Sequence, residues 1–197
     1  TVELEKDLSL KKQIVDVVII EKTEGNPPEE LPDGLENLGK HNLLSYKSIR
    51  ESFTDWTAEE LIGHFVNYRK QVSPSMKKLL PKEDFRLYAV CTKYPAKLAK
   101  EIPLKPVKQG VYDLRWGLRD IRVVVTGQIE KEERNALWLM FSAVEESVRY
   151  GFSRYRGKLE EMSHTINDLL AKYQKEGIIA MSYTLEDYRR DLKERAL

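Results

Sequence analysis

The chain is poor in the residues that form disulfides and zinc sites. It has one cysteine, Cys91, and 3 histidines among 197 residues. A single cysteine excludes an internal disulfide framework, and no histidine or cysteine pair has zinc-site spacing. The sequence also lacks a Gly-rich phosphate loop and a Gly-x-Ser-x-Gly motif, and no apolar run is long enough to cross a bilayer. We therefore expect a soluble, cytoplasmic protein with no membrane partner and no small-molecule cofactor.

The length and composition are those of one domain with a tail. With 41% hydrophobic residues, 197 residues can bury one substantial core. We expect an α/β core over residues 1–130 and a helical tail over residues 131–197 that packs on the core or on a partner subunit. The chain begins at Thr1 rather than methionine, so we expect its natural ends to be missing.

The charge is unevenly distributed although the net charge is only +1. Residues 1–68 hold 7 Lys/Arg and 14 Asp/Glu, whereas residues 69–122 hold 14 Lys/Arg and 5 Asp/Glu. A basic block of this kind is either a solvated lysine-rich face or a surface that contacts phosphates beside an acidic site. The sequence leaves both interpretations open.

Hydrophobic patterning predicts about six strands and several helices. Alternation at 2–5 and an apolar run at 13–20 indicate a hairpin, and a Pro/Gly/acid-rich loop follows. Residues 42–48 form a third strand, and a capping box beginning at Thr57 opens a helix over residues 58–72. Further strands are expected at 85–92, 111–116 and 121–128, with a short helix between Pro95 and Pro106. From Glu132 onward the pattern is helical.

A carboxylate lies inside the apolar run Ile14-Val15-Asp16-Val17-Val18, and the strand at 42–48 carries Lys47. Burying an unpaired charge costs several kcal/mol, so Asp16 must be paired, protonated or bound to a cation. Strand alternation puts Ser45 and Lys47 on one face and Leu44 and Tyr46 on the other. A lysine partner and a metal ion are both compatible with Asp16 at this stage.

This order of strands, with Asp on the second strand and Lys on the third before a helix, resembles the core of the PD-(D/E)XK nuclease superfamily. The resemblance implies a restriction-endonuclease-like α/β (α+β) fold with a mixed sheet of about six strands, a helix after the third strand and a C-terminal helical tail. It also implies that Asp16 binds Mg²⁺ or Mn²⁺ and that Lys47 lies beside the attacking water. Cations neutralise the phosphoryl oxygens and lower the pKa of bound water.

The second acid of the family signature is absent at its usual place, because Ser45 stands two residues before Lys47. A neutral hydroxyl is a poor ligand for Mg²⁺. One group of restriction enzymes in the superfamily supplies this acid from the following helix, which makes Glu60 the candidate and Glu59 its neighbour. The alternative role for Glu60 is structural, since it occupies the third position after Thr57, where a capping-box glutamate reaches back to the backbone.

Residues around the predicted helix add candidate contacts to the substrate. Another branch of the superfamily has Gln and Tyr four residues apart here, and this chain has His64 and Tyr68. A lone helical histidine is equally an interface residue. The candidate contacts are Ser45, His64, Arg69, Lys70 and Gln71, with the two basic residues facing the phosphate backbone. The runs 60–71 and 84–91 also resemble bacterial, notably cyanobacterial, proteins grouped with recombination-promoting nucleases or transposases.

Two functions follow from the resemblance. The first is a divalent-metal-dependent DNA endonuclease or transposase-associated nuclease, with Asp16, Lys47 and Glu60 as catalytic residues and Asp16 and Glu60 as metal ligands. A homodimer suits this function, because cutting both strands takes two sites. The second is an inactive protein of the same fold that binds DNA or protein, in which Asp16 and Lys47 form only a buried ion pair. We expect Cys91, Tyr68 and the three tryptophans to be packing residues, although Trp116 could also stack on a base.

Overall fold

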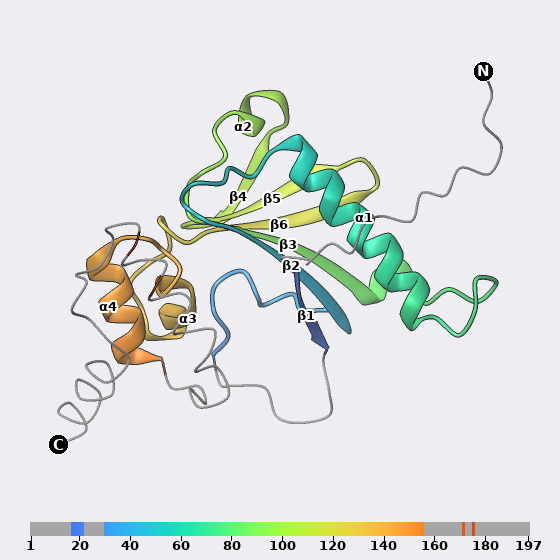
Figure 1. Cartoon of the computed structure of the whole chain (residues 1–197), viewed down its shortest axis with the longest axis horizontal. Helices are drawn as coiled ribbons and strands as arrows, with labels where there is room; N and C mark the ends of the chain where they lie inside the picture. Colours follow the sequence, from blue (N-terminus) through green and yellow to red (C-terminus); the bar gives the residue numbers. More distant parts are fainter. Residues whose placement is uncertain (1–16, 22–29, 156–170, 172–174, 176–197) are drawn as a thin grey trace.

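The structure, a computed structural model, describes residues 17–21 and 30–155 together with positions 171 and 175 (Figure 1). Helices and loops pack on one mixed β-sheet, so the expected α/β class is confirmed. The expected strand at 2–5 and the beginning of the strand at 13–20 lie outside the described residues.

The sheet combines a parallel centre with antiparallel flanks. Its strand order is β1-β2-β3-β6-β5-β4. The parallel strands β2, β3 and β6 are neighbours, while β1 pairs antiparallel with β2, and β5 pairs antiparallel with both β6 and β4. The strands are β1 (Val17–Glu21), β2 (His41–Lys47), β3 (Phe85–Cys91), β4 (Leu104–Lys108), β5 (Val111–Trp116) and β6 (Arg119–Val125).

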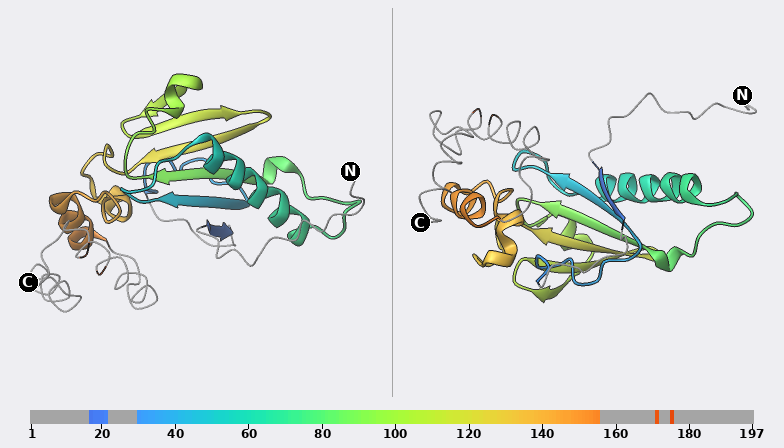
Figure 2. Two further views of the ribbon diagram at one scale, coloured as in Figure 1. Left: turned by 45° about the horizontal axis from the view of Figure 1, so that its top comes forward. Right: turned by 90° about the horizontal axis from the view of Figure 1, so that it is seen from below.

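One face of the sheet, here called the α1 face, is covered by α1 (Asp55–Val72) and the short α2 (Leu98–Glu101), as Figures 1 and 2 show. Because α1 connects the parallel neighbours β2 and β3, it runs antiparallel to β2. Leu61 and Phe65 from α1 pack on sheet residues that include Leu43, Leu87 and Ile121. Alternate residues of each strand supply this core.

The opposite face, here called the Trp138 face, is covered by residues 31–38 and by α3 (Ala136–Leu139). Trp138 and Leu139 pack there with Leu44, Tyr88 and Val124. The central strand β3 is buried on both faces, which accounts for its nearly continuous apolar sequence.

The start of α1 differs from the prediction. The N-cap is Thr54 and the helix begins at Asp55, three residues before the expected Ala58. The Thr57 hydroxyl accepts a hydrogen bond from the Thr54 backbone N–H at 2.7 Å, while the Thr54 hydroxyl accepts one from the Thr57 N–H at 3.4 Å. Threonine thus takes the position usual for Glu or Gln in a capping box. The predicted end of the helix at Val72, before Ser73 and Pro74, is confirmed.

Two further segments differ from the expected pattern. The short helix between Pro95 and Pro106 is present as α2, but β4 follows it and was not predicted. The helical segment after Glu132 is also not continuous. A 3-10 helix, η2 (Glu133–Asn135), leads into α3, and the chain then turns at Ala143, whose φ is 55°, before α4 (Glu145–Arg154). A second 3-10 helix, η1 (Lys82–Asp84), precedes β3.

Most of the expected packing residues are buried, with one exception. Cys91 is buried, Trp138 is 4% exposed, and Tyr68 and Trp116 pack against the core of the α1 face. Trp56 is 65% exposed, so the expectation that it packs in the core is wrong. It follows Asp55 on the first turn of α1, where the helix surface points to solvent.

A buried carboxylate, Asp33, joins three separate parts of the chain. Its side chain is 3% exposed and accepts hydrogen bonds from Lys108 of β4 at 2.9 Å and from Asn135 at 2.7 Å. Arg134 Nε donates to it at 3.1 Å, and its backbone carbonyl accepts from Trp138 Nε1 at 2.8 Å. Burial alone would raise the pKa of Asp33, but the donors Arg134, Lys108 and Asn135 outweigh it and hold the pKa below the ordinary value of 3.8.

We expect Asp33→Asn to destabilise the protein by about 3 kcal/mol at neutral pH, because it removes the charge that Lys108 and Arg134 neutralise. Because the pKa of Asp33 is lowered in the folded protein, the carboxylate adds to the free energy of unfolding. This contribution is complete above pH 3.8 and is lost as the pH falls through the folded-state pKa. Urea unfolding from about pH 7 to about pH 2 should therefore show the difference between the two proteins narrowing in acid. Asp120→Asn, at an exposed pair with Arg115, should cost less than about 1 kcal/mol.

Candidate functional site

The candidate site is centred on Lys47, the last residue of β2. Leu44 and Tyr46 pack on the Trp138 face, so Ser45 and Lys47 point to the α1 face, as the alternation predicted. Ser45 is 5% exposed, whereas Lys47 is half-buried. The Lys47 backbone is fixed by its pairing with Cys91 and by the Thr92 N–H, which donates to the Lys47 carbonyl at 3.2 Å.

The Lys47 ammonium has no hydrogen-bond or ion-pair partner among residues 30–155. The ammonium of a half-buried lysine is hydrated or held by an anion, since its three donors need acceptors. Asp16, the expected partner, directly precedes Val17 of β1 and lies outside the described residues. Val17 itself pairs with Ser45, two residues before Lys47.

Glu60 does not have the capping role that its spacing from Thr57 suggested, because the capping box is formed by Thr54 and Thr57 alone. The Glu60 side chain is half-buried and makes no hydrogen bond or ion pair with another described residue. Its carboxylate is therefore available to a ligand on the α1 face.

The position of Glu60 along the sheet follows from one contact at the other end of α1. The Tyr68 hydroxyl lies 3.3 Å from Nδ1 of His41, at the beginning of β2. Going back from Tyr68, a helix covers about 12 Å to Glu60, and going forward from His41, a strand covers about 13 Å to Ser45. Since α1 and β2 are antiparallel, Glu60 lies about level with Ser45.

The flank of α1 that carries Glu60 is also the one nearer to β1. Glu60, His64 and Tyr68 form one row at four-residue spacing, and Tyr68 contacts β2. The other flank faces β6, where the Arg119 guanidinium lies 3.9 Å from the centre of the Phe65 ring. Glu60 and His64 therefore lie on the flank of α1 nearer to β1, with Glu60 about level with Ser45.

The remaining predicted contacts lie at the far end of α1. Lys70 and Gln71 are exposed on its last turn. Arg69 is half-buried and its Nε donates to the Leu80 carbonyl at 2.8 Å, so it holds the loop after the helix in place. Arg69 is accordingly a structural residue, whereas Lys70 is exposed, as are Lys77, Lys78 and Lys82 in the segment between α1 and β3.

Two kinds of chemistry have no support within the described residues. Burial raises the pKa of the Cys91 thiol to about 12, so this residue is not a thiolate nucleophile near neutral pH. Across the described part of the chain, no group of three His, Cys, Asp or Glu side chains is placed to hold a metal ion. A metal site at Lys47 would therefore need a ligand from outside the described residues, and Asp16 is the predicted one.

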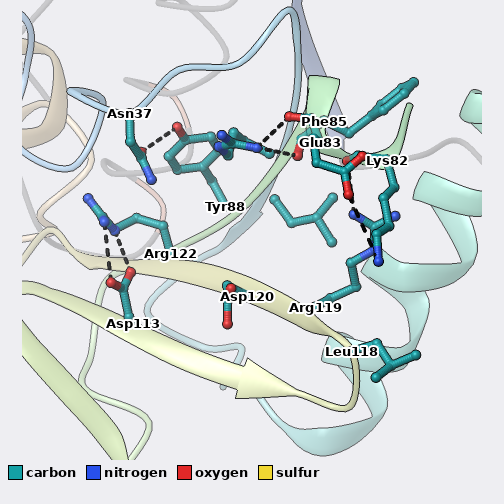
Figure 3. Close-up of a pocket in the computed structure, with 12 residues that line it drawn as sticks. Asn37, Lys82, Glu83, Phe85, Tyr88, Asp113, Leu118, Arg119, Asp120 and Arg122 are labelled. Atoms are coloured by element: carbon teal, nitrogen blue, oxygen red, sulfur yellow. Dashed lines mark hydrogen bonds and ion pairs between the residues drawn. The ribbon is translucent and has the colours of Figure 1, made fainter. Parts of the chain in front are cut away.

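A second feature, a pocket of about 380 Å³, lies away from Lys47 between the first residues of β3 and β6 (Figure 3). Its lining includes Arg86, Arg119 and Arg122, none of which was a predicted site residue. Two of these arginines could have been found from the sequence in the same way as Asp16, as charged residues inside apolar runs. Arg86 and Arg122 are charges within the apolar runs Phe85–Cys91 and Ile121–Val125.

Comparison with known proteins adds no relative. No family model, curated protein or solved structure matches this chain. Within the residues that the structure describes, no helix has the length and apolarity needed to cross a membrane.

The revised capping box makes a direct prediction about Glu60. Thr54→Ala should lower the free energy of unfolding by about 1 kcal/mol, because it removes the N-cap acceptor. Glu60→Gln should change it by less than about 0.5 kcal/mol, since no described residue bonds to the carboxylate. Chemical denaturation of both variants measures this. A loss in Glu60→Gln as large as that in Thr54→Ala would return Glu60 to a structural role.

Proposed function

We propose that the protein is a divalent-metal-dependent DNA endonuclease or transposase-associated nuclease with a restriction-endonuclease-like PD-(D/E)XK fold. The observation that carries the proposal is the half-buried residue Lys47 at the end of β2, whose ammonium has no partner among the described residues. It lies on the face that also carries Ser45 and Glu60. An unneutralised cation in this setting suits an anionic substrate.

Chain connectivity brings a second acid near this strand. Asp16 directly precedes Val17, whose partner in β2 is Ser45. Glu60 reaches the same level from α1, on the flank nearer to β1. The superfamily resemblance implies that both carboxylates approach Lys47. For Asp16 this requires the alternation of β1 to change before Val17, because the unbroken register would place it opposite Tyr46, on the Trp138 face.

The described residues provide the following chemistry for phosphodiester hydrolysis. The Lys47 ammonium would orient the attacking water and stabilise the negative charge that develops on the phosphoryl oxygens. Mg²⁺ or Mn²⁺, held by Asp16 and Glu60, would supply charge neutralisation and a bound water of lowered pKa. The Ser45 hydroxyl and the His64 ring would contact the substrate or the water around it.

The basic surface beyond α1 supports a nucleic-acid substrate. Residues 69–122 hold 14 Lys/Arg and 5 Asp/Glu, and Lys70, Lys77, Lys78 and Lys82 are exposed. Such side chains contact the phosphate backbone and do not read the base sequence. DNA is therefore the proposed partner, in the cytoplasm, with a homodimer as the form that cuts both strands.

Plasmid digestion with Mg²⁺ or Mn²⁺ tests the proposal. Wild-type protein should cleave supercoiled DNA. Lys47→Ala, Asp16→Asn and Glu60→Gln should each lower the cleavage rate by about 100-fold or more, because each removes a charged side chain that stabilises the transition state directly or through the metal ion. Lys100→Ala is the matched control, since Lys100 is exposed on α2 and should leave cleavage unchanged.

Two results would overturn the catalytic claim. One is the absence of cleavage by well-folded wild-type protein in both metals. The other is equal cleavage by wild type and the three site variants. DNA binding that persists without cleavage would favour the inactive protein of the same fold, with Asp16 and Lys47 as an ion pair.

A further inference from the structure

The pocket in Figure 3 exists because two parallel strands separate at their beginnings. The pairing of β3 with β6 starts at Leu87 and Ile121. In the same register Phe85 would lie opposite Arg119, but these residues are not paired. The resulting gap is open to side chains from both faces of the sheet, and its volume of about 380 Å³ is within the usual range of small-molecule sites.

Each acidic residue of the pocket already has a cationic partner. Asp113 accepts from Arg122 Nε at 2.6 Å, and Asp120 accepts from Arg115 at 2.8 Å. The third acid, Glu83, lies 3.9 Å from the Lys82 ammonium. The other two arginines of the pocket form no ion pair with a described residue, although the negative charge of Glu83 acts on Arg119.

Those arginines are Arg86 and Arg119, whose hydrogen bonds within the described chain go only to backbone carbonyls. Arg86 Nη1 donates to the carbonyls of Glu83 at 2.7 Å and Phe85 at 3.2 Å. Arg119 Nη1 donates to the Lys82 carbonyl at 3.0 Å. A guanidinium has five N–H donors, so most donors of both side chains are unused.

The backbone contacts also hold the two guanidinium groups in place. Arg119 is fixed further by the Phe65 ring, 3.9 Å from its central carbon. Burial lowers the pKa of Arg119, the charges of Arg69 and Arg86 lower it further, and the charge of Glu83 offsets part of this. An anion bound between the two arginines would relieve this repulsion. Because protein contacts already hold both guanidinium groups, less conformational entropy is lost when the anion binds.

We propose that the gap between the first residues of β3 and β6 is a phosphate-binding site, in which Arg86 and Arg119 bind one phosphate group of a nucleotide or of a nucleic-acid strand. Arg119 approaches from the α1 face, where it lies over Phe65, and Arg86 alternates with Phe85 and Leu87 toward the Trp138 face. Donors from two directions fit a tetrahedral phosphate, whose oxygens are spread in three dimensions, better than a carboxylate, whose two oxygens lie in one plane.

The rim of the gap provides an apolar contact for the rest of the ligand. Leu118 is 83% exposed at the turn between β5 and β6, next to Gly117, whose φ is 55°. A leucine at the mouth of a charged pocket can pack against a sugar or a base. This site is independent of the proposed nuclease centre, because none of Ser45, Lys47 and Glu60 lines it.

Fluorescence anisotropy of the full chain in EDTA tests the site without any contribution from a metal centre. The probes are a fluorescently labelled dAMP and a labelled 12-nucleotide single strand. Binding of dAMP identifies a free nucleotide as the ligand, and binding of the strand alone identifies a nucleic-acid backbone. In either case inorganic phosphate should compete, whereas acetate at the same ionic strength should not.

Arg86→Gln and Arg119→Gln should each weaken binding by about tenfold, because each removes charge-assisted hydrogen bonds to the phosphate. Leu118→Glu should also weaken binding, because it places a negative charge at the mouth of the pocket. Since Leu118 is exposed, this variant should fold even if an arginine variant does not. Arg149→Gln on α4 removes the same charge elsewhere and should bind as wild type does.

The outcomes separate this site from the proposed nuclease centre. The phosphate site would be overturned if wild type, Arg86→Gln and Leu118→Glu bound the probe with equal affinity. It would also be overturned if wild type bound neither probe. Loss of plasmid cleavage in Lys47→Ala with unchanged probe binding supports two independent sites.

Discussion

The packing of the described residues on the Trp138 face depends on the neutralisation of one buried carboxylate. Asp33 lies in the loop before β2, yet its donors come from β4 and from the segment that leads into α3. An acid with 3% of its side chain exposed is stable only when such donors are present. By satisfying it, Lys108, Arg134 and Asn135 join β4 and the segment that leads into α3 to the loop on the Trp138 face, where Trp138 completes the core. Segments that are far apart in the sequence are thus connected by polar contacts as well as by apolar packing.

The sequence predicted the elements that bury apolar residues and missed those that do not. The strands β2, β3, β5 and β6 were found because each supplies a buried face with a clear period. The strand β4 was missed because its side chains are mostly exposed and Pro106 interrupts the pattern. The start of α1 was misplaced because two threonines offer a cap, and only the structure shows that Thr54 uses Thr57 as its partner. The turn at Ala143 has neither Gly nor Pro to mark it.

The sequence also predicted only part of the candidate site. Alternation placed Ser45 and Lys47 on one face, and helical spacing placed Glu60 and His64 on one row. What the sequence could not give was the choice between two roles for Glu60, since that choice depends on which hydroxyl caps the helix. Arg86 and Arg119 could not be joined by any spacing rule either, because the gap that brings them together arises from the separation of two strands.

The edge strand β4 has a consequence for how copies of this chain can meet. A free edge of a sheet is a template for pairing with another chain, and natural proteins block it with lysines, prolines and bulges. β4 has all three: Lys105 and Lys108 are exposed, Pro106 has no N–H to donate, and the register shifts between Pro106 and Lys108. Strand-to-strand aggregation is therefore disfavoured here, and Lys108 contributes both to this protection and to the neutralisation of Asp33.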